Sequence, residues 1–232
     1  MTKAQVIALI KENQDARGIE HWKKKSAKCG LKSYGVGLTK LRKLAKQIGK
    51  DHKLAKTLWD SDIFEAKVLG LLIDDPKQLT REQVEEQVEN GNIPMFTHIF
   101  SSCDATLAKA PIAFEIACDW MDSKDPIRQQ CAYGLIYEFS KMKTKKAPEE
   151  QFFLDCIARI EKTIHDQAMW VRESMKGALF GIGKRTKVLN KAAIKAVKAI
   201  GPVDVDYGDD SGCEPFDVLK HLTSDYVKKK FA

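Results

Sequence analysis

Two groups of cationic side chains have the types and spacing to bind an anionic polymer. The first group falls within two turns of one helical segment and comprises Lys40, Arg42, Lys43 and Lys46. The second group lies about half a chain further on and comprises Arg172, Lys176, Lys184 and Arg185. Lysine and arginine neutralise phosphates and hold a nucleic-acid backbone without reading its sequence. We expect both groups to contact DNA phosphates, and solvated helix faces are the alternative for either group.

A glycine-punctuated turn, Gly35-Val36-Gly37, directly precedes the first group of cations. Free backbone amides at the start of a helix can meet a phosphate, so the turn adds to the expected anion site. It is not a nucleotide-binding loop, because a single GxG that precedes no strand–helix unit lacks the phosphate-loop and dinucleotide patterns. No cofactor is expected.

The cysteines and histidines do not form a metal-binding pattern. The six cysteines contain no CxxC pair, and the five histidines are scattered along the chain. A structural zinc site needs clustered ligands, so we expect no metal. Most of the cysteines lie in apolar helical patterns, which predicts buried, reduced thiols and no disulfide framework.

The overall charge agrees with an anionic partner. The 232 residues carry a net charge of +7, and the isoelectric point is near 9.0. No apolar run approaches the roughly 20 residues that a membrane span needs. Charged residues occupy the N-terminal stretch where a signal peptide would be apolar. We therefore expect a cytoplasmic protein without a membrane partner.

Apolar residues recur at three- and four-residue spacing almost throughout, and no segment alternates as a strand does. This pattern predicts an all-α fold: a HEAT-like repeat α-solenoid of antiparallel helix pairs, forming one domain over residues 1–232. An irregular helical bundle is the alternative. Helices are expected at about 3–16, 39–48, 51–59, 61–75, 80–89, 112–122, 126–140, 148–164, 167–183 and 187–200.

Four cap signals mark helix starts: Thr39, Asp51, Ser61 and the Thr80-Arg81-Glu82-Gln83 capping box. Asp125-Pro126 marks another, because proline suits the first turn of a helix. The acidic Gly/Pro loop at 201–216 lacks the ligand spacing of a calcium loop. We interpret it as a tether for a C-terminal helical tail, with a lid as the alternative.

Three stretches resemble the bacterial alkylation-repair DNA glycosylase family, whose members have a HEAT-like fold. They are YGVGLTKLRKLAK at 34–46, LWDSDIFEAK at 58–67 and WVRESMK at 170–176. The resemblance covers most of the chain and implies double-stranded DNA held in a basic concave groove. It also implies excision of N3- or N7-alkylated purines, whose positive charge makes them good leaving groups.

The family's catalytic aspartate follows a tryptophan by four residues, and Phe100 and Asp104 occupy the matching positions. The resemblance implies that Asp104 stabilises an oxocarbenium-like transition state or orients a water, while Phe100 contacts DNA. Asp104 also stands where an aspartate can cap a helical turn. The family's groove arginine aligns with Gln130, and its second tryptophan aligns near Gly177. Trp170 is interpreted as a packing residue.

These departures leave three functional hypotheses open. The first is a protein that binds damaged or distorted duplex DNA and excises alkylated purines. The second is a catalytically inactive paralogue that recognises branched or distorted DNA. The third is a helical scaffold with a protein partner, which the acidic helix at 82–89 fits better than it fits DNA. Our prediction is a DNA-binding protein, with enzymatic activity left undecided.

Overall fold

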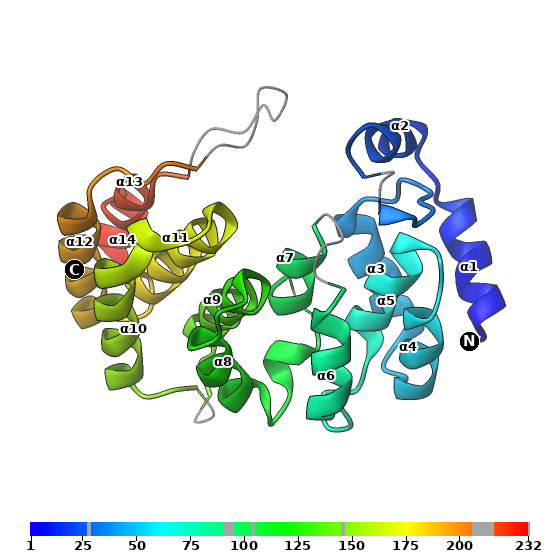
Figure 1. Ribbon diagram of the computed structural model, residues 1–232, viewed down its shortest axis with the longest axis horizontal. Coiled ribbons are helices and arrows are strands. Elements are labelled where there is room, and N and C mark those ends of the chain that lie inside the picture. The colour runs from blue at the N-terminus through cyan, green and yellow to red at the C-terminus, as the bar shows by residue number, and fades with distance from the viewer. Residues whose placement is uncertain (27–28, 91–94, 104, 145–146, 206–215, 232) are drawn as a thin grey trace. The chain divides into compact units, whose positions relative to one another are not determined.

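The computed structural model describes residues 1–26, 29–90, 95–103, 105–144, 147–205 and 216–231, and only the backbone of Lys25 (Figure 1). The chain divides into two compact units, Met1–Phe114 and Glu115–Ala232. Each unit is described by itself. The single domain expected over residues 1–232 stays a prediction.

The first unit is a set of short helices arranged around a buried central one, α5. These elements are α1 (Lys3–Glu12), α2 (Ala16–Lys25), α3 (Leu38–Ile48), α4 (His52–Trp59), α5 (Phe64–Ile73), α6 (Arg81–Val88), α7 (Phe96–Ser101) and the 3-10 turn η2 (Leu107–Lys109). All of α5 except Phe64 and Lys67 is buried, and α1, α3, α4 and α7 pack against it. Helix α3 thus packs against the apolar, buried helix α5.

Helix α3 is amphipathic, and its two faces have separate roles. Leu41 and Leu44, three residues apart, are buried on the side that meets α5. Gly37 is the N-cap, and Gly49 ends the helix with a φ of 80°, in the left-handed region that favours glycine. With this stripe buried, Lys40, Lys43 and Lys46 of α3 are exposed.

The second unit contains the four longest helices described, α9 to α12, together with shorter ones. They are α8 (Ala113–Met121), which begins at the junction with the first unit, α9 (Pro126–Lys141), α10 (Glu150–Thr163), the 3-10 turn η3 (Ile164–Asp166), α11 (Met169–Gly183), α12 (Lys187–Ile200), α13 (Val218–Leu222) and α14 (Asp225–Phe231). Helix α11 packs along α9, and α12 packs against α10 and α11. At Gly181 a side chain would collide with Ser140 and the ring of Tyr137, so this glycine allows α11 to approach α9 closely.

The expected all-helical class is confirmed, since the only β pairing within the described residues is an isolated bridge between Lys32 and Ile63. Several element boundaries also agree, and α12 spans the 187–200 predicted from the sequence. The first expected helix was wrong in its extent: α1 ends at Glu12, and α2 begins at Ala16. No helix in the described ranges is both long and apolar enough to cross a membrane.

The cap predictions had mixed outcomes. Asp51 accepts from the amide of Leu54 at 2.9 Å, and Asp125 accepts from that of Ile127 at 3.0 Å, as expected. Thr39 and Ser61 do not cap helices, because the N-caps of α3 and α5 are the residues at 37 and 63.

The capping box at the start of α6 is only half formed. Thr80 accepts from the amide of Gln83 at 3.2 Å, but the Gln83 side chain donates to Asp74 Oδ2 at 2.8 Å instead of reaching back. The buried carboxylate of Asp74 is thus the partner of the Gln83 side chain, in place of the backbone amide of Thr80.

Candidate nucleic-acid interface

The exposed face of α3 carries Lys40, Lys43 and Lys46. Their three-residue spacing keeps them within about a third of the helix circumference. Helix α3 contains no acidic residue, and no described group lies within hydrogen-bond or ion-pair distance of these three amines. The face therefore presents three uncompensated cations, of the kind that phosphate oxygens attract.

The loop before α3 is fixed by a buried carboxylate on α5. Glu65 has no exposed surface, and its Oε1 accepts from Ser33 Oγ at 2.6 Å, Tyr34 N at 3.0 Å and Val36 N at 3.1 Å. Gly35, with a φ of 71°, presses on the backbone of Gly18 so closely that neither residue could carry a Cβ. These contacts hold the start of α3 in one position.

Two further cations of this region are used inside the first unit. Arg42 Nε donates to the carbonyl of Cys103 at 3.2 Å, and Lys50 Nζ donates to Thr106 Oγ1 at 2.8 Å and to the carbonyl of Leu72 at 3.0 Å. Burial lowers the pKa of Lys50, and the nearby Lys109 lowers it further. Arg42 of α3 and Lys50, which follows α3, thus anchor the chain on both sides of Asp104, which itself lies outside the described residues.

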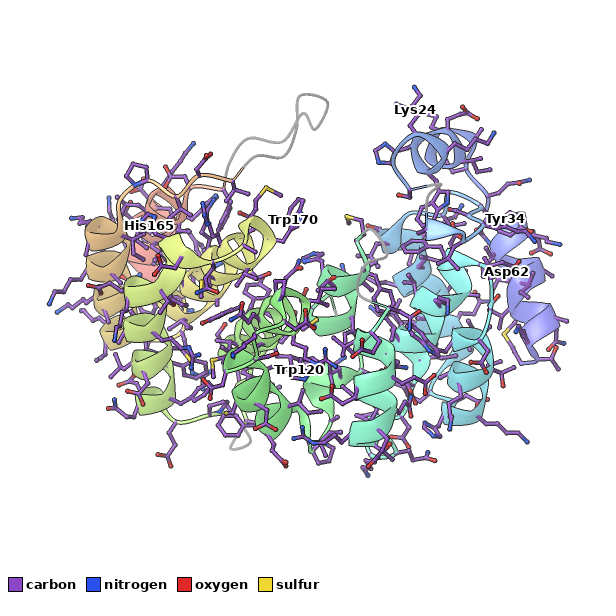
Figure 2. All side chains as sticks on the ribbon, in the orientation of Figure 1. Lys24, Tyr34, Asp62, Trp120, His165 and Trp170 are labelled. Atoms are coloured by element: carbon purple, nitrogen blue, oxygen red, sulfur yellow. The ribbon has the colours of Figure 1, made fainter. Side chains whose placement is uncertain are left out.

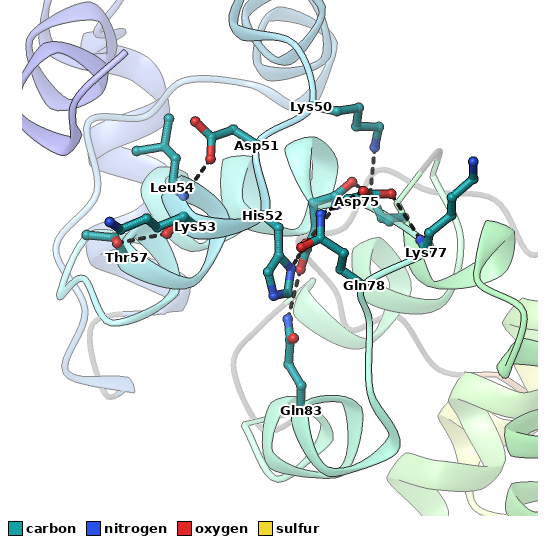
Figure 3. A network of polar contacts seen from close by, with 12 residues as sticks. Lys50, Asp51, His52, Lys53, Leu54, Thr57, Asp75, Lys77, Gln78 and Gln83 are labelled. Atoms are coloured by element: carbon teal, nitrogen blue, oxygen red, sulfur yellow. Dashed lines mark hydrogen bonds and ion pairs between the residues drawn. The ribbon is translucent and has the colours of Figure 1, made fainter.

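A polar network ties the first turn of α4 to the connection between α5 and α6 (Figure 3). The Nδ1 atom of His52 lies 2.7 Å from Oδ1 of the buried Asp74, and Asp75 N donates to the same oxygen at 2.7 Å. The carbonyl of Asp74 accepts from Thr106 Oγ1 at 3.1 Å. The network therefore extends to Thr106, whose hydroxyl also accepts from Lys50 Nζ.

The expected DNA contact through Phe100 is contradicted by its burial. Its side chain is 1% exposed, and its ring stacks on that of Phe96 with 5.7 Å between centroids. Most of the short helix α7 is buried, so Phe100 belongs to the core of the first unit.

Next to Asp104, α7 ends in a thiol–imidazole pair that the sequence did not reveal. Cys103 Sγ lies 3.0 Å from His98 Nε2, and Ser102 Oγ lies 3.3 Å from the other ring nitrogen. Cys103 has a φ of 57°, an uncommon conformation for a non-glycine residue. No spacing rule predicts this contact, because it depends on the chain turning at the end of α7. The imidazole is placed to accept the thiol proton.

In the second unit, the expected cationic group does not form one surface. Lys176 is 7% exposed and lies 3.3 Å from Glu173 Oε2. Arg172 Nε donates to the carbonyl of Gln167 at 2.7 Å. Lys184 Nζ lies 4.7 Å from the ring centroid of Phe180. These residues take part in the internal structure of the unit, and the burial of Lys176 contradicts its expected contact with DNA.

Arg185, the last member of the expected cationic group, also contacts groups inside the second unit. Its Nη1 donates to the carbonyls of Ser140 at 3.0 Å and Met142 at 2.6 Å, and its guanidinium lies 5.1 Å from the ring centroid of Phe153. It thereby satisfies carbonyls at the C-terminal end of α9, which have no partner within that helix. Arg185 has a structural role at the contact between α9 and α11.

Two exposed features of the second unit differ from the sequence interpretation. Trp170, interpreted as a packing residue, is 49% exposed near the start of α11 (Figure 2). Helix α12 carries exposed lysines at 187, 191, 195 and 198 that the sequence analysis did not single out. Their regular spacing, in a stretch without acidic residues, was the available signal.

Comparisons with known proteins agree with this architecture. A family model described as DNA alkylation repair enzyme matches residues 5–205. The uncharacterized protein Lin0241 of Listeria innocua is 25% identical over 197 residues, 83% of each chain. The uncharacterized protein Lmo0209 of Listeria monocytogenes is 24% identical over 197 residues, again 83% of each chain.

One solved structure matches the whole chain with a TM-score of 0.84 and 17% identity, covering 100% of this chain and 96% of the other. It is described as a new family of proteins related to the HEAT-like repeat DNA glycosylases with affinity for branched DNA structures. This likeness confirms the expected HEAT-like repeat fold. Since the family model matches most of the 232 residues, the chain belongs to the DNA alkylation repair enzyme family.

Proposed function

We propose that this protein binds distorted or branched double-stranded DNA through its sugar–phosphate backbone, and that the α3 face is a contact surface. The observation that carries the proposal is the set of three exposed, uncompensated lysines on a helix whose start is fixed by Glu65. The affinity for branched DNA ascribed to the structural neighbour supports this choice of partner. We place this activity in the cytoplasm, together with the DNA.

DNA binding through the backbone depends steeply on the salt concentration. Each neutralised phosphate releases counterions, so the logarithm of the affinity falls by about 0.9 per contact for each tenfold rise in salt. Backbone contacts carry little sequence information, so we expect binding that depends on DNA shape and salt but hardly on base sequence.

The test compares two lysine pairs of equal spacing in the full-length protein. Lys40→Gln/Lys43→Gln alters the α3 face, and Lys53→Gln/Lys56→Gln alters an exposed pair on α4 by the same charge. Affinity for a four-way junction and for a linear duplex is measured at several salt concentrations. We expect the α3 pair to weaken binding about tenfold and to reduce the salt slope by about 2.

The α4 pair serves as the control for net charge and should change affinity by less than about threefold. Equal losses from the two pairs would show that overall charge, and not the α3 face, determines binding. Wild-type binding that does not change with salt would contradict backbone recognition altogether.

A second candidate function is excision of alkylated purines, with Asp104 as the carboxylate. It is favoured by the anchoring of the flanking residues Cys103 and Thr106 to Arg42 and Lys50. Release of methylated purines from alkylated duplex DNA should be measured for the wild type and for Asp104→Asn. Release that the substitution abolishes supports a glycosylase, whereas DNA binding without release identifies a binding protein.

A further inference from the structure

Helix α12 carries a row of lysines along one face. Lys187, Lys191, Lys195 and Lys198 are all exposed. At 100° per residue their spacing places them within an arc of about 80°, over a rise of about 17 Å. The chain has no aspartate or glutamate between Glu173 and Asp204. The row is therefore a strip of positive charge uninterrupted by carboxylates of its own segment.

The opposite face of α12 holds the helix in place. Leu189, Ala193 and Ala196 are buried, and the helix packs against α10 and α11. Thr186 caps the helix by accepting from the amide of Leu189 at 3.2 Å, and its hydroxyl donates to Glu150 Oε2 at 2.7 Å. The lysine row thus lies on a helix that is held by its packing and by its N-cap.

The lysine amines of this row have no structural role within the described part of the chain. None of them lies within hydrogen-bond or ion-pair distance of a described group. Neighbouring cations differ in this respect, since Arg185 holds carbonyls and Lys184 lies over an aromatic ring. Like charges at four-residue spacing destabilise a helix slightly, so the row costs stability without an internal gain.

The chemistry of the face favours a polyphosphate over an apolar partner. Val188 is the only large apolar side chain exposed on α12, all of which the structure describes. The cores of protein interfaces are depleted of charged residues, and a membrane-bound helix needs a broad apolar face. A duplex carries one phosphate per 3.4 Å on each strand, so a length of about 17 Å presents about five phosphates to the four lysines.

We propose that α12 binds the backbone of a second DNA segment, so that the two units each hold one arm of a branched molecule. The inference rests on the proposed function and adds a second surface, in the other unit. It assigns to α12 the preference for branched over linear DNA, whereas α3 binds either form.

The experiment uses the full-length chain with the four α12 lysines changed to glutamine, a residue with good helix propensity. Its matched control replaces four scattered exposed lysines of the same unit by glutamine: Lys124, Lys143, Lys162 and Lys220. Both variants are checked by circular dichroism and thermal unfolding. Their affinities for a four-way DNA junction and for a linear duplex of equal length are then measured over a range of salt concentrations.

We expect the α12 variant to lose at least about tenfold on the junction, with a salt slope lower by up to about 3.6, and less than about threefold on the duplex. The control should bind both DNAs nearly as well as the wild type. Equal losses of the α12 variant on junction and duplex would overturn the assignment of a second arm.

No loss on either DNA, while the Lys40→Gln/Lys43→Gln variant still loses affinity, would overturn the inference and leave the proposed function intact. Wild-type protein that binds neither DNA would instead overturn the proposed function itself. The two failures are therefore distinguishable.

Discussion

The two units use side chains of opposite charge for comparable structural tasks. In the first unit, the buried Glu65 gathers two backbone amides and a hydroxyl from the loop before α3. In the second unit, Arg185 gathers two backbone carbonyls at the end of α9. An anion thus satisfies unpaired donors before a helix, and a cation satisfies unpaired acceptors after one.

This difference determines which cations remain for a ligand. In the first unit an acid organises the loop before α3, and the lysines at 40, 43 and 46 are exposed without a described partner. In the second unit the cations of α11 and of the turn after it contact carbonyls, a carboxylate or a ring, whereas the exposed lysines of α12 contact no described group. A count of basic residues along a segment therefore overestimates the positive charge that is free to contact a ligand.

The largest effect should come from removing the buried anion. Glu65→Ala leaves the amides of Tyr34 and Val36 and the hydroxyl of Ser33 without their acceptor. Each unsatisfied buried donor costs about 1 to 3 kcal/mol, so we expect the free energy of unfolding to fall by at least about 3 kcal/mol. Urea denaturation measures this loss.

Glu65→Gln is the control for that prediction. The amide oxygen can still accept at the Oε1 position, and Oε2 has no hydrogen-bond partner among the described residues. The loss should therefore be clearly smaller than for alanine. Two variants of equal stability would show that the loop before α3 does not depend on these hydrogen bonds.

An intermediate effect is expected for the corresponding cation. Arg185→Gln removes the charged donor from the carbonyls of Ser140 and Met142, and hydrogen bonds to charged groups contribute about 1.5 to 3 kcal/mol. Thermal unfolding should show a loss in this range. Lys191→Gln, which removes an exposed cation of the same unit, should change stability by less than about 0.5 kcal/mol.

For affinity to a four-way DNA junction, we expect the order of the two variants to be reversed: Lys191→Gln should have the larger effect and Arg185→Gln the smaller. Arg185→Gln should bind a four-way junction as the wild type does under conditions where it is folded, while Lys191→Gln should bind it more weakly. If Arg185→Gln lost affinity without losing stability, the contrast between structural and ligand-binding cations would be wrong.

The sequence predicted the helices better than the site, for a physical reason. Helix starts depend on neighbours a few residues away, so the caps at Asp51 and Asp125 could be predicted. The role of Arg185 depends on carbonyls more than forty residues earlier, which no local pattern reveals. Burial of Phe100 likewise follows from packing across the unit.

The exposed lysines of α12 were not predicted as a site, although the local sequence contains a signal for them. The lysines of α12 recur at four-, four- and three-residue intervals without an intervening acid, and helical periodicity alone places them on one face. The exposed lysines of α3 could be predicted because Leu41 and Leu44 fix the buried side of that helix. The exposure of cations could thus be predicted where an apolar stripe determined their orientation, and their contact with DNA stays a prediction.

The smallest effect concerns the thiols, which also differ between the units. Burial raises the pKa of Cys118, and it raises the pKa of Cys156 to about 12. These second-unit thiols therefore remain protonated at neutral pH and should react slowly with iodoacetamide, because the thiolate is the nucleophile. Cys103 in the first unit lies 3.0 Å from His98 Nε2, which can accept its proton. Peptide mass spectrometry should find Cys103 alkylated before Cys118 and Cys156.

His98→Ala tests the cause of that difference. Without the imidazole, alkylation of Cys103 should slow by about fivefold, while Cys118 and Cys156 should react as in the wild type. Faster alkylation of Cys156 than of Cys103 would contradict the expectation that burial slows the reaction of the second-unit thiols by raising their pKa. An unchanged rate at Cys103 in His98→Ala would show that exposure alone, and not the thiol–imidazole contact, distinguishes the first unit.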